Sequence, residues 1–223
     1  MKMLTHLLAC MAMVMIACGT LLAAQDPSMA MTEGVGVIHP MHIDAKLKTI
    51  FSNLGSKSRL FDSGNGWFVM GATNNYWGYG QDIAMPFTPK KKATAIQIKI
   101  ALEYYGVGTN GATVALYSDA SGLPGRSLKS VDITNLPTFG TCLNLGISCT
   151  VDTVKLGKGV KLKAKRQYWV VGTTDSTTQD TVDEWNYVYG DGTGNFAFRQ
   201  SGGNWNSYNS TLCAYGVFGY VVP

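Results

Sequence analysis

The chain has 223 residues, about the size of one large domain and too long for a miniprotein held together by disulfides. Hydrophobic residues make up 46% and charged residues only 14%, and there are 26 glycines, which excludes a disordered chain, a collagen and a coiled coil. The formal net charge of +4 is too small to indicate a partner. Few charges with many glycines, tyrosines, threonines, serines and asparagines favour a secreted all-β protein.

The N-terminus predicts an export signal. Lys2 precedes an apolar run from Leu7 to Ala24, and Leu22-Ala23-Ala24 forms the end that a signal peptidase requires. We therefore expect a signal peptide at residues 1–24 and a secreted or extracellular protein.

A second interpretation of the same segment is a lipoprotein signal. In the run 16–19 (IACG), Cys18 would be acylated and become the new N-terminus, and the lipid would anchor the protein to the cell envelope. Met15 stands where such signals usually carry leucine, which favours the ordinary signal peptide. A lipid at Cys18 is the only expected route to a membrane.

Residues 25–57 show no sustained period and are expected to be a linker or N-terminal arm. From 58 to 223 short apolar runs alternate with turn residues, which predicts a single antiparallel β-sandwich of jelly-roll-like topology with about ten strands. The strands are expected at Trp67–Gly71, Ile83–Thr88, Ala93–Tyr105, Ala112–Ser118, Ser127–Ile133, Thr150–Leu156, Gln167–Thr173, Glu184–Tyr189, Asn195–Gln200 and Cys213–Val221.

The same region carries a set of short motifs: FSNLG at 51–55, GWFVMG at 66–71, IAMPFTPK at 83–90, ALYSDASGLPG at 115–125, LPTFGTC at 136–142 and YWVV at 168–171. In these the chain resembles the bacterial secreted domains called choice-of-anchor, type R, over roughly residues 50–220. The most specific motif is SDASGLPG, in which Pro124 and Gly125 supply the backbone angles of a turn. The resemblance implies a β-sandwich displayed outside the cell, in a group with varied C-terminal anchors and no settled activity. Because this chain ends in YGVFGYVVP, without a spanning segment or basic tail, any tether is expected at Cys18.

No complete catalytic motif occurs. Gly106 to Gly111 spell the dinucleotide fingerprint, but a strand follows where a helix is needed, so we expect a hairpin turn. His39 and His42, the histidines that remain after the signal peptide, both lie in the N-terminal arm, which disfavours a catalytic triad. We therefore expect a non-catalytic protein with no cofactor and no metal site.

The cysteines outside the signal peptide predict one disulfide. Cys142 and Cys149 could close a short loop in an oxidising compartment. Cys213 is then left over, either as a buried thiol or as a replacement for one member of that pair.

Two charged clusters leave alternatives open. Six cations between Lys155 and Arg166 could hold an anionic polysaccharide, nucleic acid or lipid headgroups, although alternation favours a solvated strand face, and no specific nucleic acid is expected. An acidic group could supply the carboxylate pair of a secreted glycoside hydrolase or lyase, or ligate calcium with Asn186 and Asn195, although ordinary polar loops are favoured. Its members are Asp175, Asp180, Asp183, Glu184 and Asp191.

The most suggestive feature is a pair of loops that combine aromatic rings with amides. A sugar offers an apolar C–H face that stacks on a ring, and hydroxyls that bond to amides. We therefore predict a recognition or display domain that binds glycan or extracellular matrix polymer, with a structural surface or coat protein as a further alternative. Its ligand-binding residues are expected to be Asn74, Asn75, Tyr76, Trp77, Tyr79, Asn204, Trp205, Asn206 and Tyr208.

Overall fold

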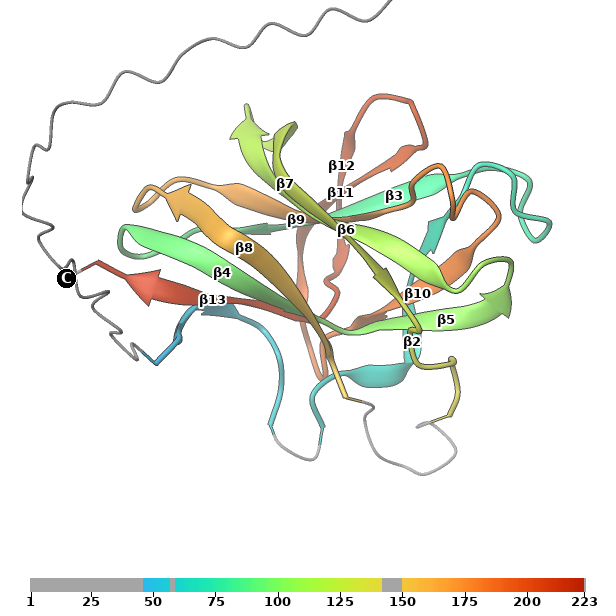
Figure 1. Cartoon of the computed structure of the whole chain (residues 1–223), viewed down its shortest axis with the longest axis horizontal. Helices are drawn as coiled ribbons and strands as arrows, with labels where there is room; N and C mark the ends of the chain where they lie inside the picture. The colour runs from blue at the N-terminus through green and yellow to red at the C-terminus, as the bar shows by residue number, and fades with distance from the viewer. Residues whose placement is uncertain (1–45, 57–58, 142–149, 223) are drawn as a thin grey trace, which may run out of the picture. The chain divides into compact units, whose positions relative to one another are not determined.

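The structure, a computed structural model, describes residues 46–56, 59–141 and 150–222. In these ranges the chain forms thirteen strands and no helix, arranged as two antiparallel sheets packed as a β-sandwich (Figure 1). The prediction of an all-β sandwich is confirmed. The strands belong to one compact unit, Ile43–Pro223. The ranges described contain no helix that could span a membrane.

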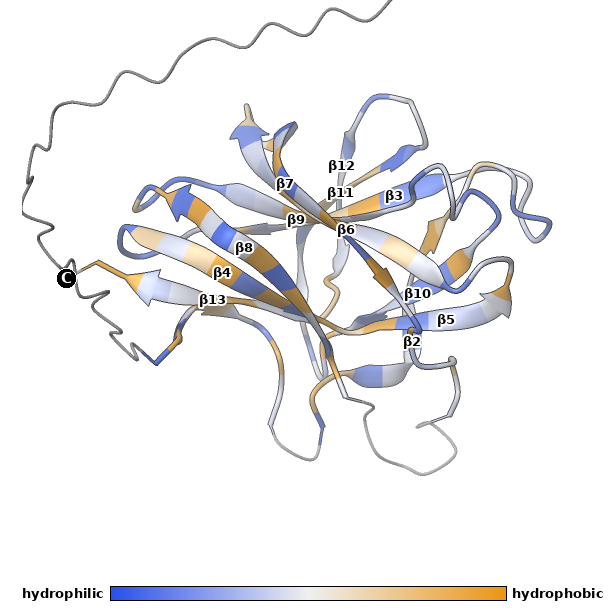
Figure 2. Ribbon diagram, in the orientation of Figure 1, coloured by the Kyte–Doolittle hydropathy of each residue, from blue (hydrophilic) through white to orange (hydrophobic). Residues whose placement is uncertain are grey.

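The smaller sheet has four strands in the order β1-β13-β4-β8. Its strands alternate buried apolar residues with more exposed polar ones. On β4, for example, Ile98 and Ile100 are buried whereas Lys99 between them is not. Figure 2 shows the same alternation of hydrophilic and hydrophobic residues along β8. The strands are β1 (Lys48–Ser52), β13 (Tyr215–Val221), β4 (Ala93–Ile100) and β8 (Asp152–Leu162).

The larger sheet has nine strands. Its main path runs β5-β10-β2-β3-β9-β6-β7, and β11 and β12 extend it from β3. The strands are β5 (Leu102–Val107), β10 (Val182–Tyr187), β2 (Asp62–Met70), β3 (Gln81–Phe87), β9 (Tyr168–Thr173), β6 (Gly111–Ala120), β7 (Leu123–Thr134), β11 (Thr193–Gln200) and β12 (Asn206–Thr211).

Strand β3 is the junction of the larger sheet. Residues 83–87 pair with β9 and residues 81–84 pair with β11, whereas β2 meets β3 only at Met70 and Gln81. A strand has two hydrogen-bonding edges, so three neighbours cannot all follow it along its length. Strand β2 therefore diverges after one residue pair, and β2, β10 and β5 form a separate arm of the sheet.

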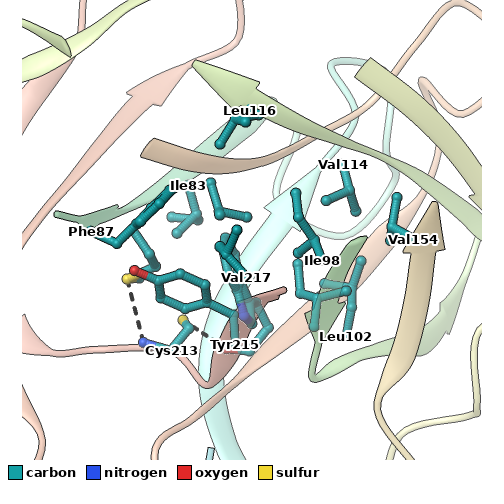
Figure 3. Close-up of a cluster of buried hydrophobic side chains, with 14 of the residues drawn as sticks. Ile83, Phe87, Ile98, Leu102, Val114, Leu116, Val154, Cys213, Tyr215 and Val217 are labelled. Atoms are coloured by element: carbon teal, nitrogen blue, oxygen red, sulfur yellow. Dashed lines mark hydrogen bonds between the residues drawn. The ribbon is translucent and has the colours of Figure 1, made fainter. Parts of the chain in front are cut away.

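The main core lies between the sheets (Figure 3). Buried Tyr215 donates its hydroxyl to the Pro86 carbonyl at 2.6 Å. Cys213 is a free, buried thiol that donates to the Trp185 carbonyl at 3.0 Å, while its N–H donates to Met85 Sδ at 3.4 Å. Of the two interpretations of Cys213, the buried thiol is thus the one observed.

Two further predictions concern residues outside the described ranges: the disulfide between Cys142 and Cys149, and the lipid at Cys18. The signal peptide, residues 1–24, lies outside them as well. Strand β1, however, lies inside the segment 25–57 that was expected to be a linker or arm, and it pairs with β13. Its apolar pair Ile50-Phe51 is too short to show a strand period.

Three local predictions are wrong. The run Ala93–Tyr105 is two strands in different sheets, because the chain leaves β4 at Ala101, whose N–H donates to the Ala214 carbonyl at 3.2 Å. The glycine-rich turn at 106–111 is not a hairpin, since β5 and β6 are not neighbours in the sheet. Residues 206–209, expected in a loop, belong to the edge strand β12, where pairing with β11 overrides their turn-like composition.

Replacing Tyr215 with phenylalanine should lower the free energy of unfolding by about 1–3 kcal/mol, because the Pro86 carbonyl would lose its hydroxyl donor. Urea denaturation followed by tryptophan fluorescence measures the change. Tyr220→Phe, an exposed tyrosine on the same strand, is the matched control and should change stability by less than about 0.5 kcal/mol. Equal losses in both variants would contradict a specific role for the buried hydroxyl.

Candidate functional site

Aromatic rings gather on the β2–β3 loop and the arm beside it. Phe68 of β2 contacts Tyr105 of β5 edge to face, with centroids 5.0 Å apart, and Tyr105 contacts Phe139 at 5.0 Å. From the loop, Tyr76 packs on Tyr105 at 5.6 Å and on Trp77 at 5.2 Å. Each such pair contributes about 0.5–1.5 kcal/mol beyond area burial. We call these five rings the loop cluster.

Asn74 fixes the loop that carries the exposed rings. Its amide nitrogen donates to the carbonyls of Gly71 and Tyr79 at 2.6 and 2.8 Å. Its amide oxygen accepts the backbone N–H groups of Tyr76 and Trp77 at 3.1 and 2.8 Å. Only 3% of Asn74 is exposed. This residue was predicted to contact ligand, but its polar atoms are already engaged in holding the loop.

The loop presents three rings to solvent. Tyr76, Trp77 and Tyr79 are 50%, 49% and 40% exposed, and the neighbouring Asn75 is exposed as well. The loop is also docked on the chain before β10, where the Gly71 N–H donates to the Thr181 carbonyl at 3.0 Å. Flat apolar faces are therefore held in place before any ligand arrives, which lowers the entropy cost of binding.

The second predicted loop is divided between two faces of the larger sheet. Half-buried Trp205 packs with Trp169 and Ala197 on the face that points away from the main core, and the Arg199 guanidinium lies 4.5 Å from its ring centre. Asn204 and Asn206 are exposed. Asn206 and Tyr208 lie on β12, opposite Phe198 and Phe196.

The rings of the two predicted loops belong to different clusters. The loops meet at their bases, where the Ser201 N–H donates to the Gly80 carbonyl at 3.0 Å. Beyond that contact Trp77 joins the rings of the arm, whereas Trp205 covers the small side chains of β3 and β11.

A pocket of about 410 Å³ opens between β2 and the β11–β12 pair. Tyr208 stacks on Phe198 at 4.5 Å and Trp67 stacks on Phe196 at 5.0 Å. The Trp67 indole N–H donates to the Thr211 carbonyl at 2.9 Å and ties β2 to β12. We call this the β12 pocket; it is lined by Trp67, Gln81, Ile83, Phe196, Phe198, Tyr208, Asn209 and Ser210.

The loop cluster and the β12 pocket lie on opposite faces of β2, because Trp67 and Phe68 are consecutive strand residues. Sequence reasoning assigned Trp67, Phe68, Tyr105 and Phe198 to strands and missed their part in these surfaces. The signal that could have found them is the pair Trp67-Phe68. Consecutive strand residues point to opposite faces, so each face of this strand must carry one large ring.

The acidic residues proposed for the enzyme alternative lie on different elements of the fold. Asp175, Asp180 and Asp191 lie outside the strands. Asp183 is paired with Val69 and faces the main core, whereas Glu184 faces the opposite side of β10. Glu184 instead lies directly opposite Glu103 of β5, a residue that sequence reasoning missed.

Burial changes the protonation of this arm. It raises the pKa of Asp183 to about 8, and it raises those of Glu103 and Glu184 to about 7. The negative charges of Glu184 and Asp152 add to the rise at Glu103. By contrast, hydrogen bonds from Thr177 lower the pKa of Asp175. The buried carboxyls are therefore protonated in acidic solution and charge only near neutral pH.

The described residues contain no group of three or more histidine, cysteine or acidic side chains that could hold a metal ion. Comparisons with family models, curated proteins and solved structures found no match for the chain. The resemblance to choice-of-anchor domains thus stays a prediction that rests on its motifs.

The free energy of unfolding should fall as pH rises from about 4.5 to about 8. The unfolded chain releases the protons of Glu103, Glu184 and Asp183 near pH 4, whereas the folded chain keeps them until about pH 7 to 8. Between these limits the unfolded state binds fewer protons, so each pH unit costs about 1.4 kcal/mol per such group. Thermal unfolding at stepped pH measures the slope.

Asp183→Asn should flatten this slope, because an amide cannot titrate. Asp191→Asn, an exposed loop position, is the control and should leave the slope unchanged. Stability that rises across this range, or an equal slope in Asp183→Asn, would contradict the protonation of Asp183 in the fold.

Proposed function

We propose that this chain is a secreted, non-catalytic recognition domain that binds glycan or extracellular matrix polymer through the loop cluster. The observation that carries the proposal is the set of half-exposed rings at Tyr76, Trp77 and Tyr79 on a loop fixed by Asn74. Sugar C–H faces stack on such rings, and the exposed Asn75 amide can bond to hydroxyls at their edge. Because these rings lie on an open surface, they suit contact with sugar residues along the length of a polymer chain.

The β12 pocket offers a second surface of the same chemistry. Tyr208 is nearly half exposed, and amide and hydroxyl groups of Gln81, Asn209 and Ser210 stand beside the rings. A hollow of about 410 Å³ suits a sugar residue at a chain end or branch. Two such sites on one domain would strengthen attachment to a polymer by avidity.

The placement of the acids supports the non-catalytic form of the proposal. A glycosidase needs two carboxyls that flank the scissile bond, within reach of substrate and water. Asp183 and Glu184 face opposite sides of their strand. Glu184 does face Glu103, but both are buried.

The Glu103–Glu184 pair is the one feature that favours the enzyme alternative, because their raised pKa values of about 7 match those of general acids. Assay of polysaccharide turnover with Glu103→Gln and Glu184→Gln variants tests it. Turnover that both variants abolish would replace the recognition proposal with a hydrolase or lyase.

Trp77→Ala should weaken binding to polysaccharide by about 1–3 kcal/mol, because the exposed half of the ring supplies the stacking surface. The mature protein is screened against soluble and insoluble polysaccharides by pull-down, and titration calorimetry then compares variants. Tyr220→Ala, which removes a similarly exposed ring from the other sheet, is the matched control.

Equal affinity of Trp77→Ala and the parent for every glycan bound would contradict the loop cluster as the site. A parent protein that binds no polysaccharide would contradict the glycan proposal altogether. Concentration-dependent assembly without glycan affinity would then select the structural surface or coat protein.

A further inference from the structure

A second pocket is lined by four positively charged side chains and four other residues. Its volume is about 290 Å³, and its lining residues come from the β6–β7 hairpin, from the end of β8 and from the chain that follows β8. Arg126 comes from β7, Lys161 from β8, and Lys163 and Arg166 from the connection between β8 and β9. We call it the cationic pocket; its remaining lining residues are Ser118, Asp119, Leu128 and Tyr168.

The positive charges of this pocket are not neutralised from within the described part of the chain. Asp119 is the single acid in the lining, and its Oδ1 accepts from Gln167 Nε2 at 3.0 Å and Trp169 Nε1 at 2.9 Å. Its Oδ2 accepts the Gly122 N–H at 3.1 Å. The one salt bridge among described residues, Arg199 with Asp82, lies elsewhere. Four cations therefore share the hollow with one carboxylate that is already hydrogen-bonded.

Backbone hydrogen bonds fix the chain segments that carry these cations. The Arg126 N–H donates to Ser118 Oγ at 3.2 Å, and the Lys163 N–H donates to the buried Tyr168 hydroxyl at 2.9 Å. Between Lys163 and Arg166 the chain turns through Lys165 in the left-handed region, with φ of 57°. That conformation is costly for a residue other than glycine and is anchored by its N–H on the Pro89 carbonyl at 2.8 Å. Like charges held together in this way repel, and a bound anion relieves the repulsion.

We propose that the cationic pocket binds the sulfate or carboxylate groups of an anionic polysaccharide. The positive surface continues along β8 through exposed Lys155 and Lys158, which matches a chain with repeated anionic groups better than one small anion. A single-stranded nucleic acid would need exposed rings for base stacking, and the ring in this lining, Tyr168, is buried. The site shares no residue with the loop cluster or the β12 pocket, so it does not rest on the glycan proposal made for them.

The test compares two triple variants with the same change in charge. Arg126→Gln/Lys161→Gln/Arg166→Gln removes three pocket cations, and Lys46→Gln/Lys48→Gln/Lys129→Gln removes three exposed cations outside the lining. Heparin and polygalacturonate are the sulfated and carboxylated probes, dextran is the neutral one, and duplex DNA is a polyanion without sugar sulfates or carboxylates. Affinity is measured across a salt series, with circular dichroism to verify folding.

Heparin or polygalacturonate should bind the parent in a salt-dependent way, and the pocket variant should bind roughly tenfold or more weakly at low salt. The control variant should stay within about twofold of the parent. An equal loss of affinity in both triple variants would overturn the proposal, because net charge alone would then explain the binding. Failure of the parent to bind either anionic probe, or DNA binding as tight as heparin binding, would overturn it too.

Discussion

The two hydrogen-bonding edges of β3 are the constraint on which the binding surfaces depend. Because β9 and β11 follow this strand, β2 can meet it only at Gln81 and must then diverge. The divergence separates the arm of β2, β10 and β5 from β11 and β12, and the β12 pocket lies between them. Both faces of β2 therefore contribute to a binding surface: Trp67 lines that pocket, and Phe68 belongs to the loop cluster. A sheet whose strands paired evenly would have closed this hollow.

The outer face of the arm joins the rings to buried carboxyls. Phe68, Glu184 and Glu103 lie opposite one another across β2, β10 and β5, so their side chains share a face. Tyr105, two residues beyond Glu103, adds a ring on that face. Since burial raises the pKa of both glutamates to about 7, the face beneath the loop cluster carries little charge below neutral pH. The rings therefore rest on a polar but largely uncharged support, which suits a neutral ligand.

The sequence alone sufficed for the fold class, because alternating apolar residues and turn punctuation depend on local chemistry. It also indicated the exposed rings at Tyr76 and Trp77, since a ring in an amide-rich loop has few partners nearby. It could not reveal that the Asn74 amide forms its hydrogen bonds within the loop, or that Trp205 packs against β3 and β11. Those outcomes depend on contacts between residues far apart in the chain, as does the meeting of Glu103 with Glu184 and of Arg126 with Lys161. Pairing across a sheet follows from topology, which local patterns do not encode.

The buried acidic side chains and the cations of the cationic pocket lie in different parts of the fold. The buried carboxyls with raised pKa values lie on β5, on β10 and at the first residue of β8. The cations of the cationic pocket lie on β7, at the far end of β8 and just after it. Strand β8 thus runs from Asp152, whose pKa burial raises to about 6, to Lys161 in the cationic pocket. A polymer with anionic groups would be attracted by the exposed lysines of this strand toward the cationic pocket. A nearly balanced net charge can therefore conceal a strongly polarised surface, and for that reason the sum of charges is a weak guide to partners for this chain.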